Sequence, residues 1–457
     1  MTSISRFCAL PWPLFRKALS LANLPDGSFS ESMTPDQREL ILNGLVASLA
    51  IDDEELTASL MKLRTRVPTL ELLWSTRATE IKSGEAAKAA GEPQRPDPWS
   101  GEAYSGGIRI LHLSDLHLTG QSSVDLIGNQ LILGVDEYCP KQKLDYVVVS
   151  GDFTDRGSLK GFDSALNFLQ VISEKLNVPA KRFILVPGNH DVVDNLKAYS
   201  RVENPPATIG FSDCVSFVPP NGGSVHFQRK LPEYRKRFVS FSKRLYKPFL
   251  GYDYPLDEAK QGIVHSFPDD SIQFLTLNSA WEIDEFNRKR SSVHAQAINR
   301  LREQAIGESE GAQAVGVGER SLEAVFRIAV CHHSVLGPEQ IRDTTFMDDL
   351  QILKTRILLH GDVHQLNRSD YLGYRPNRRI HVLGSGAFAA AKEDRPESTP
   401  RLCNYLEISK DRRFLRVHTL KKGNELGPWQ PMKDWIKPGS DETTGVSYFA
   451  VALDPGY

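Results

Sequence analysis

Residues 108–117 read Ile-Arg-Ile-Leu-His-Leu-Ser-Asp-Leu-His, in which a mainly apolar run over 108–113 leads into an aspartate and a histidine. Short apolar runs of this kind recur at Tyr146–Val149, Phe183–Val186, Ile272–Leu277, Ile328–Val330, Ile357–Leu359 and Ile380–Leu383. Segments with helical periodicity lie between some of these runs, at 124–138, 161–176 and 293–305. The alternation predicts an α/β architecture in which helices cover the faces of the sheet.

The composition is that of an ordinary folded protein. Of 457 residues, 40% are hydrophobic and 25% are charged, which excludes a disordered or collagen-like chain. The net charge of -2 argues against a chain that binds nucleic acid or membranes through its overall charge. The five cysteines never form a Cys-x-x-Cys pair, which favours a reducing compartment. No apolar run reaches the ~18 residues that a membrane span needs, so we expect a cytoplasmic protein with no membrane partner.

The composition also changes along the chain, which predicts four parts. Residues 1–82 carry helical periodicity and predict a small N-terminal helical region, a candidate for binding a protein partner. Residues 83–107 collect Gly, Pro, Ser and Glu and predict a linker. The main domain is expected over 108–420, with 192–262 as a cap-like insertion that sets substrate specificity, and 421–457 as a C-terminal tail.

Polar residues follow the predicted strands in five blocks: 114–117, 151–157, 188–191, 331–333 and 360–364. In an open α/β sheet the loops at the carboxyl ends of the strands form the ligand crevice, so these blocks can converge. Several carboxylates and imidazoles in one crevice repel or desolvate one another unless cations neutralise them, which predicts a metal site. Oxygen and nitrogen ligands without a thiolate favour Mn²⁺, Fe or Zn²⁺.

The spacing inside two of the blocks supports the same interpretation. Asp115 and His117 are two residues apart, and so are Asp362 and His364. On an extended segment, such a spacing places both side chains on one face, where a single ion can bind them.

Taken in order, the blocks resemble those of the calcineurin-like metallophosphoesterase superfamily over about residues 108–420. They read Asp115-x-His117, Gly151-Asp152-x-x-Asp155-Arg156-Gly157, Gly188-Asn189-His190-Asp191, His332 and Gly361-x-x-His364. Any one block is a weak signal, but five in the right order at strand ends are specific. The resemblance implies a four-layer α/β/β/α sandwich with a binuclear centre of two divalent metal ions.

The resemblance also implies a role for each matching residue. The first metal would be held by Asp115, His117, Asp152 and His364. Asp152 would bridge to the second metal, whose other ligands would be Asn189 and His332. His190 would be the general acid, Asp155 would orient it, and Arg156 would contact the phosphate.

Position 362 departs from the pattern of the superfamily. Most members have a histidine there that binds the second metal, whereas this chain has Asp362. A carboxylate also binds hard or borderline cations, so we take Asp362 as a ligand and favour Mn²⁺, with Fe and Zn²⁺ as alternatives. Because degenerate members of the superfamily act as scaffolds, the departure also supports an alternative of another class, a catalytically weak protein-binding scaffold.

The function implied is a hydrolase, a binuclear metal-dependent phosphoesterase that acts by metal-activated hydroxide. Phosphodiesterase action on a nucleotide or related small molecule is the first choice, and phosphomonoester hydrolysis is the alternative. No Gly-x-Ser-x-Gly, Walker loop or His-Glu-x-x-His in the sequence supports a rival chemistry.

A helical apolar stripe is predicted from Phe227 to Leu245, with a basic face over 229–247. This basic face consists of Arg229, Lys230, Arg235, Lys236, Arg237, Lys243, Arg244 and Lys247. Such a face is a candidate surface for nucleic acid, and the alternative is the solvated face of an ordinary helix. It is the only support for a second enzyme reading, a DNA or RNA nuclease of the SbcD/Mre11-like type.

Overall fold

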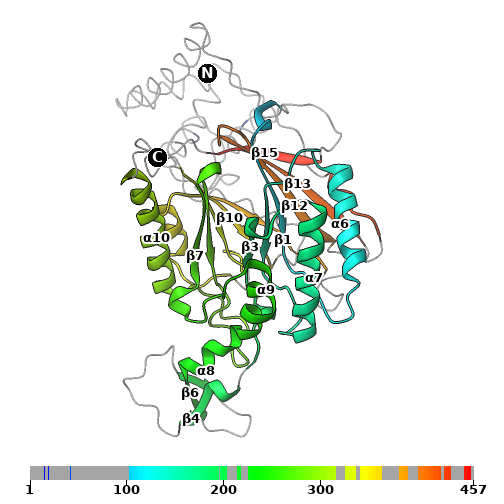
Figure 1. Cartoon of the computed structure of the whole chain (residues 1–457). Coiled ribbons are helices and arrows are strands. Elements are labelled where there is room, and N and C mark those ends of the chain that lie inside the picture. The colour runs from blue at the N-terminus through cyan, green and yellow to red at the C-terminus, as the bar shows by residue number, and fades with distance from the viewer. Residues whose placement is uncertain are drawn as a thin grey trace, which may run out of the picture. The chain divides into compact units, whose positions relative to one another are not determined.

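The computed structural model divides into two compact units, Met1–Arg95 and Pro96–Tyr457 (Figure 1). It describes residues 102–194, 196–202, 214–217, 225–314, 325–335, 340–362, 380–386, 388–389, 400–423, 427–433 and 447–453, together with Phe15, Leu19 and Leu42. Those three isolated residues are helical and buried. The rest of the predicted helical region 1–82, and the linker up to residue 101, lie outside the described residues.

The first large sheet holds the strand that leads into Asp115. Its described strands number seven, in the order β14-β13-β12-β1-β2-β3, with β15 paired to β13. The strands β1 to β3 are parallel, and the others pair antiparallel with their neighbours. The bounds are β1 Ile108–Leu113, β2 Tyr146–Ser150, β3 Phe183–Val186, β12 Arg401–Ile408, β13 Phe414–Lys422, β14 Gln430–Pro431 and β15 Tyr448–Ala452. The segment expected to be a tail, 421–457, therefore contributes β14 and β15 to this sheet.

The second large sheet has the order β11-β10-β9-β8-β7 among its described strands. The strands β8 to β11 are parallel, and β7 is antiparallel to β8 at the edge. The bounds are β7 Gly262–Phe267, β8 Ile272–Leu277, β9 Phe326–Val330, β10 Thr355–His360 and β11 His381–Gly384. All seven apolar runs that predicted strands thus form strands, and β7 was not predicted.

Adjacent residues of each strand enter different hydrophobic clusters because side chains alternate between the two faces of a sheet. Ile110 and Val148 of the first sheet share a cluster with Phe274 and Ile328 of the second. The two sheets therefore pack against each other through these faces. Leu111, next to Ile110, belongs instead to a cluster on the opposite face of the first sheet.

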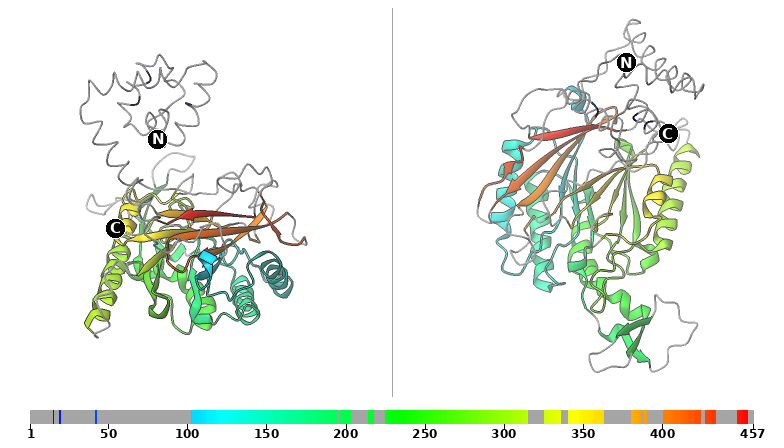
Figure 2. Two further views of the ribbon diagram at one scale, coloured as in Figure 1. Left: turned by 90° about the horizontal axis from the view of Figure 1, so that it is seen from above. Right: turned by 180° about the vertical axis from the view of Figure 1, so that it is seen from behind.

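Helices cover the outer faces of the two sheets. On the first sheet, Leu131 of α6 (Val124–Tyr138) and Phe168 of α7 (Leu159–Lys175) pack with Leu111. The second sheet is covered by α10 (Ala295–Ala314) and α11 (Phe346–Ile352). Figures 1 and 2 show α6 and α7 on one side of the sheets and α10 on the other. The predicted mixed α/β class is confirmed.

The insertion 192–262 begins with a small antiparallel sheet of order β4-β6-β5, which lies beyond α8 in Figure 1. Its strands are β4 Tyr199–Val202, β5 Cys214–Phe217 and β6 Val225–Arg229. A helical stretch follows, made of α8 Leu231–Arg235, the 3-10 turn η5 Lys236–Phe238, the π-helix η6 Phe241–Tyr246 and α9 Lys247–Leu250. The prediction of a helix from Phe227 is wrong at its start, because β6 occupies those residues and helix begins at Leu231, with Pro232 in its first turn.

Single 3-10 turns connect several of these elements. They are η1 Glu102–Tyr104, η2 Ala180–Arg182, η3 Asn189–Asp191, η4 Leu196–Ala198, η7 Glu258–Lys260 and η8 Pro268–Asp270. Within the described part of the chain, no helix has the length and apolar character that crossing a membrane requires.

Candidate metal centre

The candidate centre lies where the parallel strands of both sheets end. Asp115 follows β1, Asp152 follows β2, and Asn189 follows β3 in the first sheet. His332 follows β9 and Asp362 follows β10 in the second sheet. The predicted convergence of these five strand ends is therefore what the topology produces.

The backbone at this edge is left-handed at four of the predicted ligands: φ is 55° at Asp115, 43° at His117, 56° at Asp152 and 56° at Asp362. A non-glycine residue in this region costs of order 1–3 kcal/mol and persists only where its surroundings fix it. Asp115 N–H donates to the Gly151 carbonyl (3.1 Å), and His117 N–H donates to the Asp152 carbonyl (2.9 Å), so the two loops fix each other. The assumption that Asp115 and His117 lie on an extended segment is wrong, because β1 ends at Leu113 and both residues turn.

The side chain of Asp152 occupies the middle of the cluster. Its Oδ2 lies 3.6 Å from His117 Nε2 and 3.3 Å from His332 Nε2. His332 Nε2 also lies 2.9 Å from Asn189 Oδ1. The Asp152 carboxylate oxygen thus lies between imidazoles that come from the loops of the two sheets.

Residues can share one metal ion only if their potential ligand atoms lie close to one another. Three sets of three residues have ligand atoms within 4.8 Å of one another among the described residues. Two of these sets share Asp115, which joins His117 and Asp152 in one and His332 and Asp362 in the other. The third set is His117, Asp155 and His190. Of the predicted ligands, the structure brings together Asp115, His117, Asp152, Asn189, His332 and Asp362, while His364 lies outside the described residues.

The polar atoms at the centre fit divalent metal ions. Asp115 is 1% exposed, and its Oδ1 has no hydrogen-bond partner among the described atoms. His332 Nδ1 donates to the Ser150 carbonyl at 2.7 Å, which directs Nε2 toward the oxygens of Asn189 and Asp152. A nitrogen that faces two acceptor oxygens needs a positive charge between them, either a proton or a metal cation.

The pKa values of the buried groups follow from the same crowding. Burial alone would raise the pKa of Asp152, but the nearby His332 and His190 hold it well below its ordinary value. Burial alone would lower the pKa of His332, but Asp152 raises it well above the ordinary value. Asp152 is therefore held in its charged form, and its negative charge attracts a positive partner, either a proton on His332 or a metal cation in its place.

Asp191 is a structural residue of the site to which sequence analysis gave no role. It is fully buried, and its carboxylate accepts the Thr154 N–H at 3.1 Å and the Gly188 N–H at 2.9 Å. It thereby joins the loop after β2 to the loop after β3. Burial and the charge of Asp152 raise the pKa of Asp191 to about 7. Its position next to Asn189 and His190 in the sequence was a signal that could have identified it as part of the site.

Glycines are required at two positions because other groups come very close. A Cβ on Gly188 would lie 2.1 Å from Asp152 Oδ1. Gly151 has a φ of 100°, and its Cβ would lie 2.5 Å from His332 Nδ1. These glycines let the loops approach closely enough to pack the ligands together.

The predicted catalytic residues lie at the solvent side of the centre. The ring nitrogen Nδ1 of His190 is 3.3 Å from Asp155 Oδ1. The backbone N–H of His190 donates to Asp152 Oδ1 at 2.8 Å. The His190 side chain is 24% exposed, whereas Arg156 is 84% exposed. A partly exposed imidazole with a carboxylate partner is available for proton transfer to a bound substrate.

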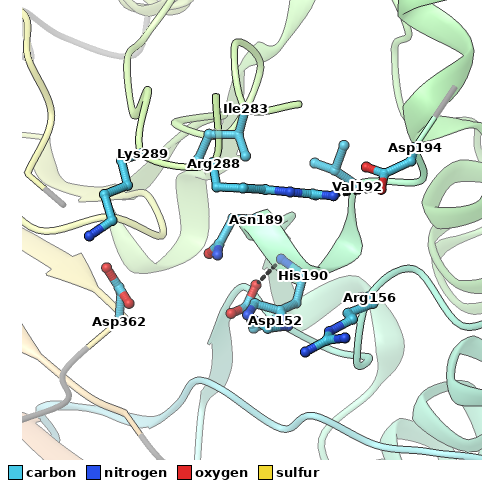
Figure 3. Close-up of a pocket in the computed structure, with 10 residues that line it drawn as sticks. All are labelled: Asp152, Arg156, Asn189, His190, Val192, Asp194, Ile283, Arg288, Lys289 and Asp362. Atoms are coloured by element: carbon cyan, nitrogen blue, oxygen red, sulfur yellow. Dashed lines mark hydrogen bonds and ion pairs between the residues drawn. The ribbon is translucent and has the colours of Figure 1, made fainter. Parts of the chain in front are cut away.

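A cavity of about 610 Å³ opens over these residues (Figure 3). Its lining consists of Asp152, Arg156, Asn189, His190, Val192, Asp194, Ile283, Arg288, Lys289 and Asp362. Five of these residues were not singled out from the sequence: Val192, Asp194, Ile283, Arg288 and Lys289. The basic run Arg288-Lys289-Arg290 was a signal that could have found two of them.

The predicted basic face 229–247 is not a continuous cationic surface. Arg229 and Arg237 are buried, at 5% and 1% exposed. Five others form ion pairs: Arg235 with Glu258 and Asp257, Lys236 with Glu233, Lys243 and Lys247 with Asp253, and Arg244 with Asp163. Seven of the eight basic residues are therefore buried or ion-paired, which leaves less free positive charge on this face than the sequence alone indicates.

Comparison with known proteins identifies the family of the chain. The family model for calcineurin-like phosphoesterases matches residues 108–366, which confirms the predicted resemblance. No curated protein matches the chain.

Three solved structures are similar at low identity. GAP50, the anchor in the inner membrane complex of Plasmodium, has 11% identity and a TM-score of 0.35, with 71% of this chain and 87% of that chain covered. A single-site variant of Vps29 from Entamoeba histolytica has 8% identity and a TM-score of 0.28, with 71% and 97% covered. TT1561 of Thermus thermophilus has 12% identity and a TM-score of 0.34, with 68% and 98% covered. Because the family model covers more than half of its residues, the chain belongs to the calcineurin-like phosphoesterase family.

Proposed function

We propose that this chain is a metal-dependent phosphoesterase that hydrolyses a phosphodiester of a nucleotide or related small molecule, with phosphomonoesters as the alternative substrate. One observation carries the proposal. Asp152 Oδ2 lies between His117 and His332, beside a buried Asp115 oxygen that has no hydrogen bond among the described atoms. Such a set of carboxylate and imidazole donors binds divalent cations.

The proposed metal ligands divide between the two sheets. Asp115, His117 and Asp152 would hold one ion, with His364 as a further ligand. Asn189, His332 and Asp362 would hold the other, and Asp152 would contact both. When bound, two divalent cations would neutralise the carboxylates, acidify the attacking water and polarise the phosphate.

The residues of the chain then bind the substrate and supply the proton. His190 faces the cavity and would protonate the leaving oxygen, while Asp155, 3.3 Å from its Nδ1, would hold the ring in orientation. Arg156 is exposed at the cavity and would bind a phosphate oxygen through its planar guanidinium.

We propose Mn²⁺ as the activating metal because Asp362 adds an oxygen donor to the second position, with Fe and Zn²⁺ as alternatives. Replacing Asp362 with His should shift the order of activating metals from Mn²⁺ toward Zn²⁺. The measurement is turnover of metal-depleted protein after addition of each ion. An unchanged order of metals would contradict a ligand role for Asp362.

The test of the function uses full-length protein with Mn²⁺ and four substrates: p-nitrophenyl phosphate, bis-p-nitrophenyl phosphate, cyclic nucleotides and single-stranded DNA. We expect hydrolysis of one of the small esters that EDTA abolishes and Mn²⁺ restores. Hydrolysis of DNA alone would favour the nuclease alternative, whose support from the basic face is weakened by the ion pairs described above. No turnover with Mn²⁺, or with Fe or Zn²⁺ added in its place, would favour the protein-binding scaffold and refute the proposal.

A further inference from the structure

The wall of the cavity that faces the metal centre comes from the loop between β8 and α10, residues 278–294, here called the β8–α10 loop. It contributes Ile283, Arg288 and Lys289 to the cavity. Figure 3 shows Arg288 extended across the cavity and Lys289 directed toward Asp362. Two cationic groups thus lie opposite the predicted metal ligands.

The β8–α10 loop is held in shape by a buried carboxylate. Asp284 is fully buried and accepts the backbone N–H groups of Phe286 (3.0 Å) and Asn287 (2.9 Å). It also accepts the hydroxyls of Tyr199 and Tyr234, which belong to the insertion. These bonds fix the turn that precedes Arg288.

A buried arginine of the insertion holds the other side of the loop. The Arg237 guanidinium donates to the carbonyls of Trp281 (2.6 Å) and Ile283, and it lies 3.3 Å from the centre of the Tyr234 ring. Val192, at the start of the insertion, packs with Ile283 in one apolar cluster. The insertion therefore contacts the β8–α10 loop directly, and the cationic residues of that loop line the cavity.

Arg288 keeps donors available for a ligand. Its Nη2 donates to Asp194 at 2.5 Å, and its side chain is 55% exposed. A guanidinium carries five N–H donors in a planar fork that matches the oxygens of a phosphate. The pair with Asp194 fixes the direction of the side chain across the cavity and leaves other N–H groups to bind an anion.

We propose that Arg288 and Lys289 form a subsite for a second phosphate group of the substrate, away from the phosphate that is cleaved. This inference rests on the proposed phosphoesterase function. The cavity of about 610 Å³ is of the size that holds a whole nucleotide-like ligand, so it has room beyond the scissile phosphate. The metal ions and Arg156 would bind the scissile phosphate. Arg288 and Lys289, on the opposite wall, would therefore bind a different anionic group of the substrate.

The experiment compares esters that differ by one phosphate. For a diesterase the pair is the dinucleotide ApA and its 5′-phosphorylated form pApA. For a monoesterase the pair is adenosine 3′-phosphate and adenosine 3′,5′-bisphosphate. We expect kcat/KM to be at least about tenfold higher for the ester with the second phosphate, because charge-assisted hydrogen bonds to it add binding energy. The gain should lie in KM, since the second phosphate is bound equally before and during the reaction.

The decisive variant replaces both cations, Arg288→Gln with Lys289→Gln, and should bring the kcat/KM ratio of the two substrates close to one. The matched control is Lys243→Gln with Arg244→Gln, which removes the same charge from residues paired with Asp253 and Asp163 outside the cavity. The control should keep the ratio of the wild type. Circular dichroism and thermal unfolding establish that both variants are folded.

Two outcomes would overturn the subsite. If the wild type hydrolyses both esters equally well, no second phosphate is recognised. If the double variant loses the same factor with both esters, the two cations only balance the charge of the metal centre. Either result leaves metal-dependent hydrolysis itself intact, whereas absence of any metal-dependent turnover refutes the proposed function instead.

Discussion

The two walls of the cavity are built in different ways. The wall of the metal centre is fixed by backbone bonds between loops that follow neighbouring strands, such as His117 N–H to the Asp152 carbonyl at 2.9 Å. The opposite wall, the β8–α10 loop, is fixed by two buried side chains, Arg237 and Asp284. The first wall therefore follows from the sheet topology, whereas the second depends on individual side chains that are distant in sequence.

The largest expected effect tests the central ligand of the metal wall. Asp152→Asn keeps the shape but removes the charge shared by His117 and His332, so we expect loss of most bound metal and of nearly all turnover. Metal content by mass spectrometry and turnover of bis-p-nitrophenyl phosphate measure this. Asp125→Asn, at an exposed position of α6, is the control. Retention of more than about a tenth of the activity, a loss below ~1.4 kcal/mol of barrier, would contradict the assignment.

The next effect separates proton transfer from metal binding on the same wall. His190→Ala should reduce the rate by roughly 10² to 10⁴ for esters with poor leaving groups, and by less for p-nitrophenyl esters, whose leaving group departs without a proton. The comparison of two substrates on one variant is its own control. Equal losses with both would exclude His190 as the general acid.

A third substitution tests whether the backbone fixes the metal wall. Gly188→Ala removes no ligand, but the new Cβ would lie 2.1 Å from Asp152 Oδ1 and displace that carboxylate. We expect metal affinity to fall by about 10- to 100-fold, as for other changes that disturb ligand orientation. Gly423→Ala, where a Cβ meets nothing within 4 Å, should bind metal like the wild type. Equal affinities for the two variants would show that the metal wall does not need this close approach.

The smallest effect concerns the side chains that hold the opposite wall. Arg237→Ala leaves the carbonyls of Trp281 and Ile283 without their donor, and we expect the domain to lose about 2–4 kcal/mol of stability. Its neighbour Arg235 makes partly exposed ion pairs, so Arg235→Ala should cost under about 1 kcal/mol. Thermal unfolding measures both, and the substrate ratio described above should fall for Arg237→Ala alone. Similar stability and ratios in the two variants would refute the role of Arg237.

Local patterns predicted the wall of the metal centre because its ligands lie directly after strands. The run 108–113 is mostly apolar and buried along its whole length since β1 is covered on both faces, and the residues after it converge once the strands are parallel. The pattern could not give the backbone of these residues, and the extended geometry assumed for Asp115 and His117 was wrong. A left-handed backbone at these two residues produces no repeating pattern of apolar residues, so the sequence could not indicate it.

The opposite wall could not be predicted because its contacts join distant segments. Arg237 lies in a basic stretch that resembles a solvent face, and its role is shown only by its burial and its bonds to the carbonyls of Trp281 and Ile283. The residues 225–229 form a strand, yet Phe227 continues the helical spacing of Leu231 and Tyr234, so the period alone misplaced the start of the helix. The edge strand β7 is partly exposed, and its weak apolar pattern explains why it was missed.

The position of β1 in its sheet has a consequence for how the protein is made. On one side β1 pairs with β2, but on the other it pairs with β12, in a register that joins Ile108 to Ile408. During synthesis, β1 therefore keeps one unpaired edge until the residues of β12, about 300 positions later, have left the ribosome, and pairing across such a sequence distance is slow. Asp115 and His117, which follow β1, are held by a strand that is paired on both sides only after β12 has joined the sheet. A chain truncated after residue 366 would contain every residue of the family match and still leave β1 open to aggregation.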